Sequence, residues 1–293
     1  MTQTLPNPKY FSCIITLGTL AVNFFVLHVL FLFKNTNDSH FHLKPSANQT
    51  TKQAFFSSAR KCKSSVDSTQ DANYMRSQLG EDAMLLKWFS TLCGGTYIEL
   101  GALDGVQYSN SHLFHYTRQW KGVLIELMGH NYENLILNRK NELATIHAGV
   151  CSTPLTLHYY GGEPKGVNAV GGIYEFSTPE FRKDWWDDIS LDDPKVNTIE
   201  CDTMDNLLKK NTNQTFFDFL SLDVEGAELS VLESIDFKRV GFGIIFAEQG
   251  YNHLKSLAMR EFVENHGYDF LQEYQGSYWW INRDFYHIYK NEI

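Results

Sequence analysis

From residue 74 onward, strand-like and helix-like segments alternate along the chain, and this alternation restricts the folds open to it. Parallel strands need helical crossovers, so the pattern predicts an α/β fold with a mostly parallel sheet and helices on both faces. We expect strands at residues 96–100, 122–127, 143–150, 196–201, 216–224 and 242–248. We expect helices at residues 74–92, 110–119, 130–140, 179–188, 203–210, 227–234 and 254–266. Residues 268–274 and 277–282 flank Gln275-Gly276, which predicts a C-terminal antiparallel hairpin.

The first expected strand ends in a loop of glycines and acids, Glu99-Leu-Gly-Ala-Leu-Asp-Gly105. Glycine lets the backbone approach a ligand closely, which is typical of a nucleotide-cofactor pocket. The full GxGxxG of dinucleotide binders is missing. The carboxylates of Glu99 and Asp104 would repel a pyrophosphate but suit a cofactor with a sulfonium and an amino acid. The loop therefore favours S-adenosylmethionine (SAM) over NAD.

Glu126 ends the second expected strand, about 20 residues beyond the loop. An acid at this spacing accepts hydrogen bonds from ribose hydroxyls. The alternative is an exposed acid at a strand end. Because Glu126 accompanies the Glu99 loop, we expect the ribose role.

A third acidic segment, Ser221-Leu-Asp-Val-Glu-Gly-Ala-Glu228, closes an apolar run that fits a strand buried on both faces. In open parallel sheets, ligands bind at the carboxyl ends of the strands. Four acids are expected at such ends: Glu99, Glu126, Asp223 and Glu248. Their common position predicts one shared site.

Three segments together resemble the FkbM family of SAM-dependent methyltransferases. They are Tyr97-Ile-Glu-Leu-Gly-Ala-Leu-Asp-Gly105, Leu124-Ile-Glu126 and Leu222-Asp-Val-Glu-Gly-Ala-Glu228, and Ser77-Gln-Leu-Gly-Glu-Asp82 is also similar to that family. The resemblance covers residues 74–282. It implies a class I, Rossmann-like methyltransferase fold with a seven-stranded sheet, and O-methylation of a glycan or a small molecule.

The resemblance also implies residue roles. SAM would be held by Glu99, Gly101, Asp104, Gly105, Glu126 and Asp223. A hydroxyl is a poor nucleophile, so a general base is expected, and Asp223 and Glu225 are the catalytic candidates. His112 and His115 lie at helical spacing beyond the loop, and each could be the base or a packing residue. Asp223 and Glu225 could instead bind a metal, but no third ligand is visible, so no metal is expected.

Residues 151–195 form an irregular, Gly-rich middle section, where we expect acceptor specificity. Its candidate aromatic side chains are Tyr159, Tyr160, Trp185 and Trp186. Their rings could stack on a sugar or belong to the core.

The chain begins with an uncharged apolar run at residues 10–33, bracketed by Lys9 and Lys34. About 20 apolar residues span a bilayer, whereas a cleaved signal peptide has a shorter core and a small-residue cleavage site. We therefore expect an uncleaved transmembrane signal anchor. The expected order is a short cytosolic tail (1–9), the anchor (10–33), a flexible stem (34–73) and the methyltransferase domain (74–293).

Several features favour a single-pass type II membrane protein with its domain in the lumen of the endoplasmic reticulum or Golgi. N-glycosylation sequons begin at Asn37, Asn48 and Asn213. Four of the five cysteines lie outside the apolar run, and they could form disulfides or remain thiols. Cys151 and Cys201 are the first pair to test.

The net charge of −9 disfavours nucleic acid as a partner.

A second interpretation follows from the layout of one membrane anchor and one FkbM-like domain, which is similar to that of Star-like proteins. Those proteins are associated with secretory trafficking, so the domain would be a binding module for a membrane-protein cargo. The acids of the cofactor loop favour the enzyme, because a scaffold has no need of them.

Overall fold

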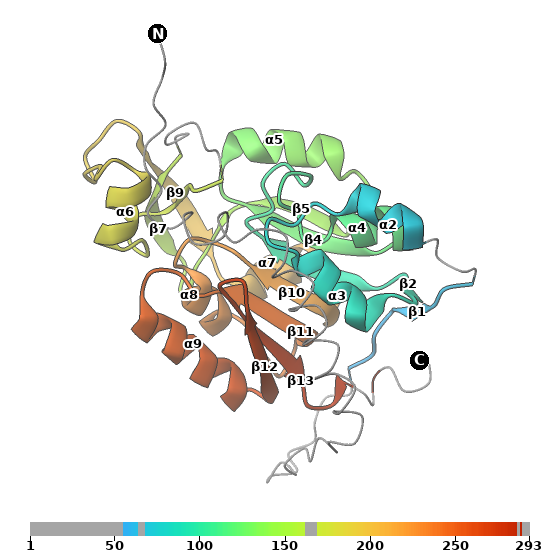
Figure 1. The fold of residues 1–293 in the computed structure, drawn as a ribbon. Coiled ribbons are helices and arrows are strands. Elements are labelled where there is room, and N and C mark those ends of the chain that lie inside the picture. Colours follow the sequence, from blue (N-terminus) through green and yellow to red (C-terminus); the bar gives the residue numbers. More distant parts are fainter. Residues whose placement is uncertain (1–54, 64–67, 162–168, 286–287, 289–293) are drawn as a thin grey trace, which may run out of the picture. The chain divides into compact units, whose positions relative to one another are not determined.

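In the computed structural model, which describes residues 55–63, 68–161, 169–285 and 288, a seven-stranded sheet forms the centre of the fold (Figure 1). From edge to edge its strands are β12 (Tyr268–Tyr274), β13 (Ser277–Asn282), β11 (Gly241–Glu248), β10 (Phe216–Leu222), β3 (Thr96–Leu100), β4 (Lys121–Glu126) and β5 (Ala144–His147). The strands from β11 to β5 are parallel, and β13 is antiparallel to both of its neighbours. The α/β class and the C-terminal antiparallel hairpin are therefore confirmed, within a mixed sheet.

Helices cover both faces of this sheet and bury two separate hydrophobic cores. On one face lie α7 (Met204–Asn211), α8 (Glu228–Glu233) and α9 (His253–Asn265), and on the other lie α3 (Glu81–Phe89), α4 (His112–Arg118) and α5 (Gly129–Asn138). Side chains alternate along each strand, so Ile98 of β3 belongs to one core and Tyr97 to the other. Because both faces are covered, the parallel strands are continuously apolar, which made them recognisable in the sequence.

A second sheet of four strands includes β7 (Leu155–Tyr160) and β8 (Gly172–Ile173) from the middle section, and the sequence did not predict this sheet. Its order is β6 (Gly149–Val150), β9 (Val196–Asp202), β7 and β8, with α6 (Pro179–Trp185) beside it (Figure 1). The strand predicted at residues 143–150 is consequently divided between β5 and β6. The disulfide Cys151–Cys201, expected as the first pair to test, links the end of β6 to β9.

The segment before residue 74 packs on the domain wherever it is described. It contributes β1 (Arg60–Lys61), which pairs with β2 (Leu92–Cys93), and α2 (Ser68–Tyr74), which lies against α4. The disulfide Cys62–Cys93 holds the β1–β2 pair, and Ala59 is fully buried. The stem predicted at residues 34–73 and the domain start at residue 74 are thus wrong for residues 55–63 and 68–73. A few buried side chains and one disulfide anchor this polar segment, so it carries no hydrophobic period.

The expected membrane anchor at residues 10–33 lies outside the described residues, as does the tail before it. Within the described ranges, no helix is long and apolar enough to cross a membrane. The described residues all belong to the compact unit Thr50–Ile293.

Candidate active site

A cavity of about 310 Å³ lies at the carboxyl ends of β3, β4, β10 and β11, and residues 169–173 close it from the side of the second sheet. The four predicted strand-end acids all line it, and so does a fifth carboxyl side chain; the five are Glu99, Glu126, Asp223, Glu225 and Glu248. Within the described part of the chain, no Lys, Arg or His side chain lines this cavity. The four strand-end acids therefore line one cavity, and its charge favours a cationic or hydroxyl-bearing ligand over an anionic one.

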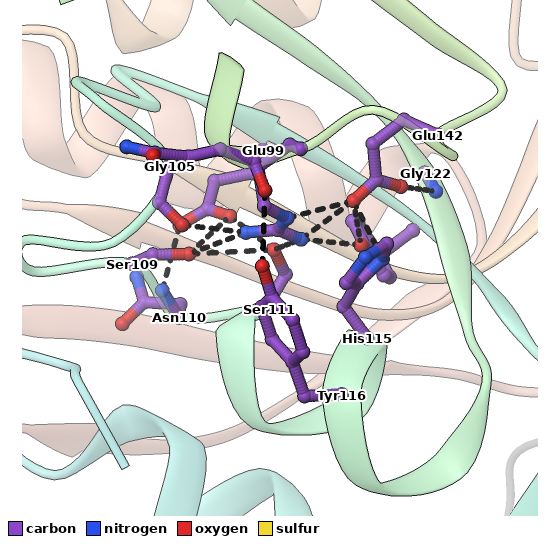
Figure 2. Close-up of polar contacts among 12 residues, drawn as sticks. Glu99, Gly105, Ser109, Asn110, Ser111, His115, Tyr116, Gly122 and Glu142 are labelled. Atoms are coloured by element: carbon purple, nitrogen blue, oxygen red, sulfur yellow. Dashed lines mark hydrogen bonds and ion pairs between the residues drawn. The ribbon is translucent and has the colours of Figure 1, made fainter. Parts of the chain in front are cut away.

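Glu99 is the last charged residue of β3 and is only 3% exposed. Its Oε1 accepts a hydrogen bond from the Asn110 amide (2.6 Å), and its Oε2 accepts from the hydroxyls of Ser109 (3.0 Å) and Ser111 (Figure 2). Burial raises the pKa of Glu99, while the charge of Arg139 and these hydrogen bonds oppose the rise. Oε1 keeps acceptor capacity, since each carboxylate oxygen can take two hydrogen bonds.

Glu126 ends β4 with its carboxylate held by backbone amides. Oε2 accepts from the Leu103 N–H and Oε1 from the Met128 N–H, both at 2.8 Å. Burial raises the pKa of Glu126, and the hydrogen bonds oppose this effect. The Asn131 side chain and the Leu127 amide also hydrogen-bond to Glu126, so its carboxylate is held firmly at the edge of the cavity, where the ribose role places it.

Gly101 is required for contact between two loops rather than for room around a ligand. Its φ is +73°, and a Cβ at this position would lie 2.0 Å from the carbonyl oxygen of Asp223. The Asp223 amide in turn donates to the Leu100 carbonyl (3.4 Å). Only glycine lets the loop after β3 meet the loop after β10 so closely.

Three non-glycine residues that line the cavity have left-handed backbone conformations: Leu103 (φ 47°), Tyr108 (φ 57°) and Glu225 (φ 56°). Each such conformation costs about 1–3 kcal/mol and persists only where the surroundings enforce it. Backbone strain of this kind clusters at functional sites, and nothing in the sequence predicted it at these three positions.

Asp223, Glu225 and Glu248 form a carboxyl cluster at one end of the cavity. Asp223 and Glu248 are hydrogen-bonded to each other, and burial raises the pKa of Asp223. Burial, with the charge of Asp223, raises the pKa of Glu225 well above its usual range. The charge of Asp223, followed by burial, does the same to the pKa of Glu248. Asp223 is exposed to the cavity and Glu225 and Glu248 are half-buried, so their mutual repulsion makes simultaneous ionisation of all three carboxyls unfavourable. In the described residues, no group of three or more His, Cys, Asp or Glu side chains is placed to hold a metal ion.

Two residues predicted to bind the cofactor do not line the cavity. Asp104 turns back on its own loop, where its Oδ1 accepts from the amides of Val106 (2.9 Å) and Gln107 (2.7 Å). Gly105 has φ +75° and packs against Arg139, which approaches within 2.5 Å of where a Cβ would stand. Both residues shape the loop, because its turn carries them away from the strand ends.

The two histidines considered as bases also lie outside the cavity lining. The Nδ1–H of His112 donates to the Tyr74 carbonyl (2.9 Å), and burial lowers the pKa of His112 to about 4. His115 places Nδ1 2.9 Å from Glu142 Oε1. Both are packing residues of α4, so the carboxyl cluster contains the base candidates.

Helix α6 and the loop after β11 supply aromatic side chains to the cavity lining, which the sequence predicted only in part. Trp185 lines the cavity, and its Nε1 donates to the hydroxyl of Tyr251 (3.1 Å), which also lines it. Trp186 is instead core, 1% exposed and packed against Tyr160 and Phe181. Neither Tyr159 nor Tyr160 belongs to the cavity lining. Tyr251 follows the strand-end acid Glu248 closely, and that position was the available signal for it.

The fold and this acid-lined cavity define an α/β domain of the methyltransferase type. The sequence matches the family model of the methyltransferase FkbM domain over residues 99–270, more than half of the chain. The chain therefore belongs to the FkbM methyltransferase family. No curated protein matches it.

Two solved structures are similar to the chain. A methyltransferase FkbM from Methylobacillus flagellatus KT is 14% identical, with a TM-score of 0.41, over 64% of this chain and 43% of that one. A TehB-like SAM-dependent methyltransferase from Corynebacterium glutamicum is 12% identical, with a TM-score of 0.36, over 73% of this chain and 90% of that one. The chain thus spans less than half the length of the first structure.

Proposed function

We propose that this chain is a SAM-dependent O-methyltransferase whose acceptor is a hydroxyl of a glycan or a small molecule. The observation that carries the proposal is the cavity with five carboxyl side chains and, in the described part of the chain, no basic one. Such a lining opposes pyrophosphate cofactors and suits the sulfonium and ammonium groups of SAM. Membership of the FkbM methyltransferase family supports the same conclusion.

The residues at the strand ends fit such a cofactor. Glu99 would receive the ammonium group, because its Oε1 has spare acceptor capacity, and Glu126 would receive the ribose hydroxyls. Asn110 lines the same cavity and leaves its Oδ1 buried without a partner among the described residues. A buried acceptor without a partner is costly, so a ligand that satisfies it would gain affinity.

When bound, SAM supplies an electrophilic methyl group, and the chain must activate and orient the acceptor hydroxyl. Asp223 and Glu225 are the base candidates, because they line the cavity and their raised pKa values make them stronger bases than ordinary carboxylates. The hydrogen bond between Glu248 and Asp223 raises the pKa of Glu248 and lowers that of Asp223, so Glu248 holds the proton of this pair and leaves Asp223 able to accept one from the acceptor hydroxyl. Trp185 and Tyr251 offer aromatic surface on the side of the acceptor.

The proposed setting is a type II membrane protein with its domain in the lumen of the endoplasmic reticulum or Golgi. Two disulfides, Cys62–Cys93 and Cys151–Cys201, support an oxidising compartment. The sequon asparagine Asn213 is exposed in the loop between α7 and β10. The membrane contact itself would come from residues 10–33.

The test is SAM binding by isothermal titration with the full-length chain in detergent, followed by transfer of radiolabelled methyl to a panel of glycans. Glu126→Ala is expected to weaken binding about a hundredfold, because two charge-assisted hydrogen bonds are lost. The control is Glu133→Ala, an exposed residue of α5. Unchanged affinity of Glu126→Ala would overturn the ribose assignment. A membrane cargo that co-purifies with Glu126→Ala, together with no SAM binding by the unaltered chain, would favour the Star-like interpretation.

A further inference from the structure

A buried polar network lies behind the cofactor loop and is centred on Arg139, the residue that caps the C-terminus of α5. Arg139 is 1% exposed. Its guanidinium donates five hydrogen bonds, to Gly105 O (2.8 Å), Ser109 Oγ (3.2 Å), Ser111 Oγ (2.9 Å), Tyr97 Oη (2.5 Å) and Glu142 Oε1 (2.8 Å). Three of these five acceptors belong to the loop between β3 and α4.

The two serines connect Arg139 to the cavity. Each hydroxyl accepts from Arg139 and donates to Oε2 of Glu99, and the amide between them donates to Oε1 (Figure 2). The same loop carries Tyr108, which is held in a left-handed conformation, and Asn110, and both line the cavity. Arg139 therefore supports the cavity wall without lining it.

The buried positive charge of Arg139 needs a carboxylate in direct contact, and Glu142 provides it on the side away from the two serines. Glu142 accepts from Arg139 Nε (2.8 Å) and from the Gly122 amide (2.6 Å), and it lies beside His115. Burial alone would raise the pKa of Glu142, but the His115 hydrogen bond and the charge of Arg139 lower it. Arg139 thus lies between two buried carboxylates, Glu142 directly and Glu99 through the serines.

Arg118 is a second buried arginine in this chain, and unlike Arg139 it has only a packing role. It is also 1% exposed, and its two terminal nitrogens each lie 2.8 Å from a carboxylate oxygen of Asp71. Its other bonds reach the Ser90 carbonyl and Thr117. None of these residues lines the cavity, so Arg118 joins α4 to α2 and to the end of α3, away from the site.

We propose that Arg139 is a positioning residue for the cofactor. Through Ser109 and Ser111 it holds the Glu99 carboxylate and the strained loop in the arrangement that receives the ammonium end of SAM. This inference rests on the proposed function.

The experiment measures binding of two ligands to the full-length chain by isothermal titration. S-adenosylhomocysteine carries the amino-acid end, and 5′-methylthioadenosine lacks it. Arg139→Lys is expected to weaken binding of the first ligand about tenfold or more, because one ammonium cannot replace five directed donors. Its affinity for 5′-methylthioadenosine should stay within about twofold, since the ribose site at Glu126 is intact.

Two further variants guard against a general loss of folding. Ser111→Ala removes one link between Arg139 and Glu99 with little change in volume, and a selective loss of about threefold or more is expected. Arg118→Lys is the matched control and should lower the melting temperature without a selective loss of either ligand.

Equal affinity of Arg139→Lys, Ser111→Ala and the unaltered chain for S-adenosylhomocysteine would overturn the positioning role. Equal losses for both ligands would overturn it too, since they indicate general damage. If Arg139→Lys does not fold, the affinities of Ser111→Ala for the two ligands test the positioning role instead. If the unaltered chain binds neither ligand, the proposed cofactor is wrong and the inference falls with it.

Discussion

At the scale of single residues, carboxyl groups at the ends of strands define the chemistry of the cavity. Each of the acids Glu99, Glu126 and Asp223 stands where an apolar strand ends, so its place at the sheet edge could be read from the sequence. The direction of a loop side chain could not. Asp104 looked equivalent to Glu99, yet it caps its own turn, because short-range amides at residues 106 and 107 compete for its carboxylate.

Glu228→Gln is expected to stabilise the folded chain at pH 8 and to change its stability little at pH 4.5. Burial raises the pKa of Glu228 from 4.5 to about 7, so folding disfavours the ionised form. The stability that protonated Glu228 contributes is full below about pH 4.5 and is lost as the pH rises through about 7. The glutamine stays neutral and can still accept from the amides of Val224 and Gly226. The gain is at most on the order of 3 kcal/mol.

Urea unfolding at both pH values measures this difference. Glu233→Gln, an exposed change on the same helix, is the control and should show no pH-dependent gain. Identical free energies of unfolding for Glu228→Gln and the unaltered chain at pH 8 would contradict the prediction.

At the scale of elements, the helices and strands of the central sheet could be predicted, whereas the short elements could not. The central strands are covered on both faces and therefore carry long apolar runs. β1, β2, β6 and β8 have two residues each, too few for any period to appear. They form where disulfides and distant neighbours hold them, as Cys62–Cys93 holds β1 to β2 and Cys151–Cys201 joins β6 to β9.

The two disulfides are expected to differ in their effect on ligand binding. Replacing Cys62 and Cys93 by serine should lower the free energy of unfolding by about 2–4 kcal/mol and leave affinity for S-adenosylhomocysteine unchanged, since β1 and β2 lie outside the cavity lining. Replacing Cys151 and Cys201 by serine should lower both the free energy of unfolding and the affinity for S-adenosylhomocysteine, because Gly149 and Val150 of β6 line the cavity. Urea unfolding and titration calorimetry measure the two effects. Equal affinities in both double variants would contradict the second expectation.

At the scale of the whole molecule, the chain combines an acidic FkbM domain with an apolar N-terminal run. The domain is the part the structure describes, and its cavity is built from four strand ends and one wall contributed by the middle section. The membrane setting stays a prediction of the sequence at residues 10–33. The described domain adds the exposed sequon and the two disulfides in its support.

Expression of the full-length chain in secretory cells is expected to yield N-glycosylated protein. Digestion with an N-glycosidase should increase its gel mobility, and Asn213→Gln should remove part of that shift, because Asn213 is exposed on a loop. Mobility that does not respond to the glycosidase would count against a lumenal domain. Asn211→Gln serves as the matched control, since it lies outside any sequon.

By itself the sequence determined the α/β class, the strand ends and their acids, and the FkbM family, because apolar runs and short motifs are local properties of the chain. Tertiary structure alone decided which acids share the cavity, that Gly101 is needed against Asp223, and that Arg139 supports Glu99 from behind. It also decided that the middle section contributes two strands to a second sheet and closes the cavity on one side. These features depend on contacts between residues far apart in the chain, where side-chain direction and burial are fixed only once the sheet has formed.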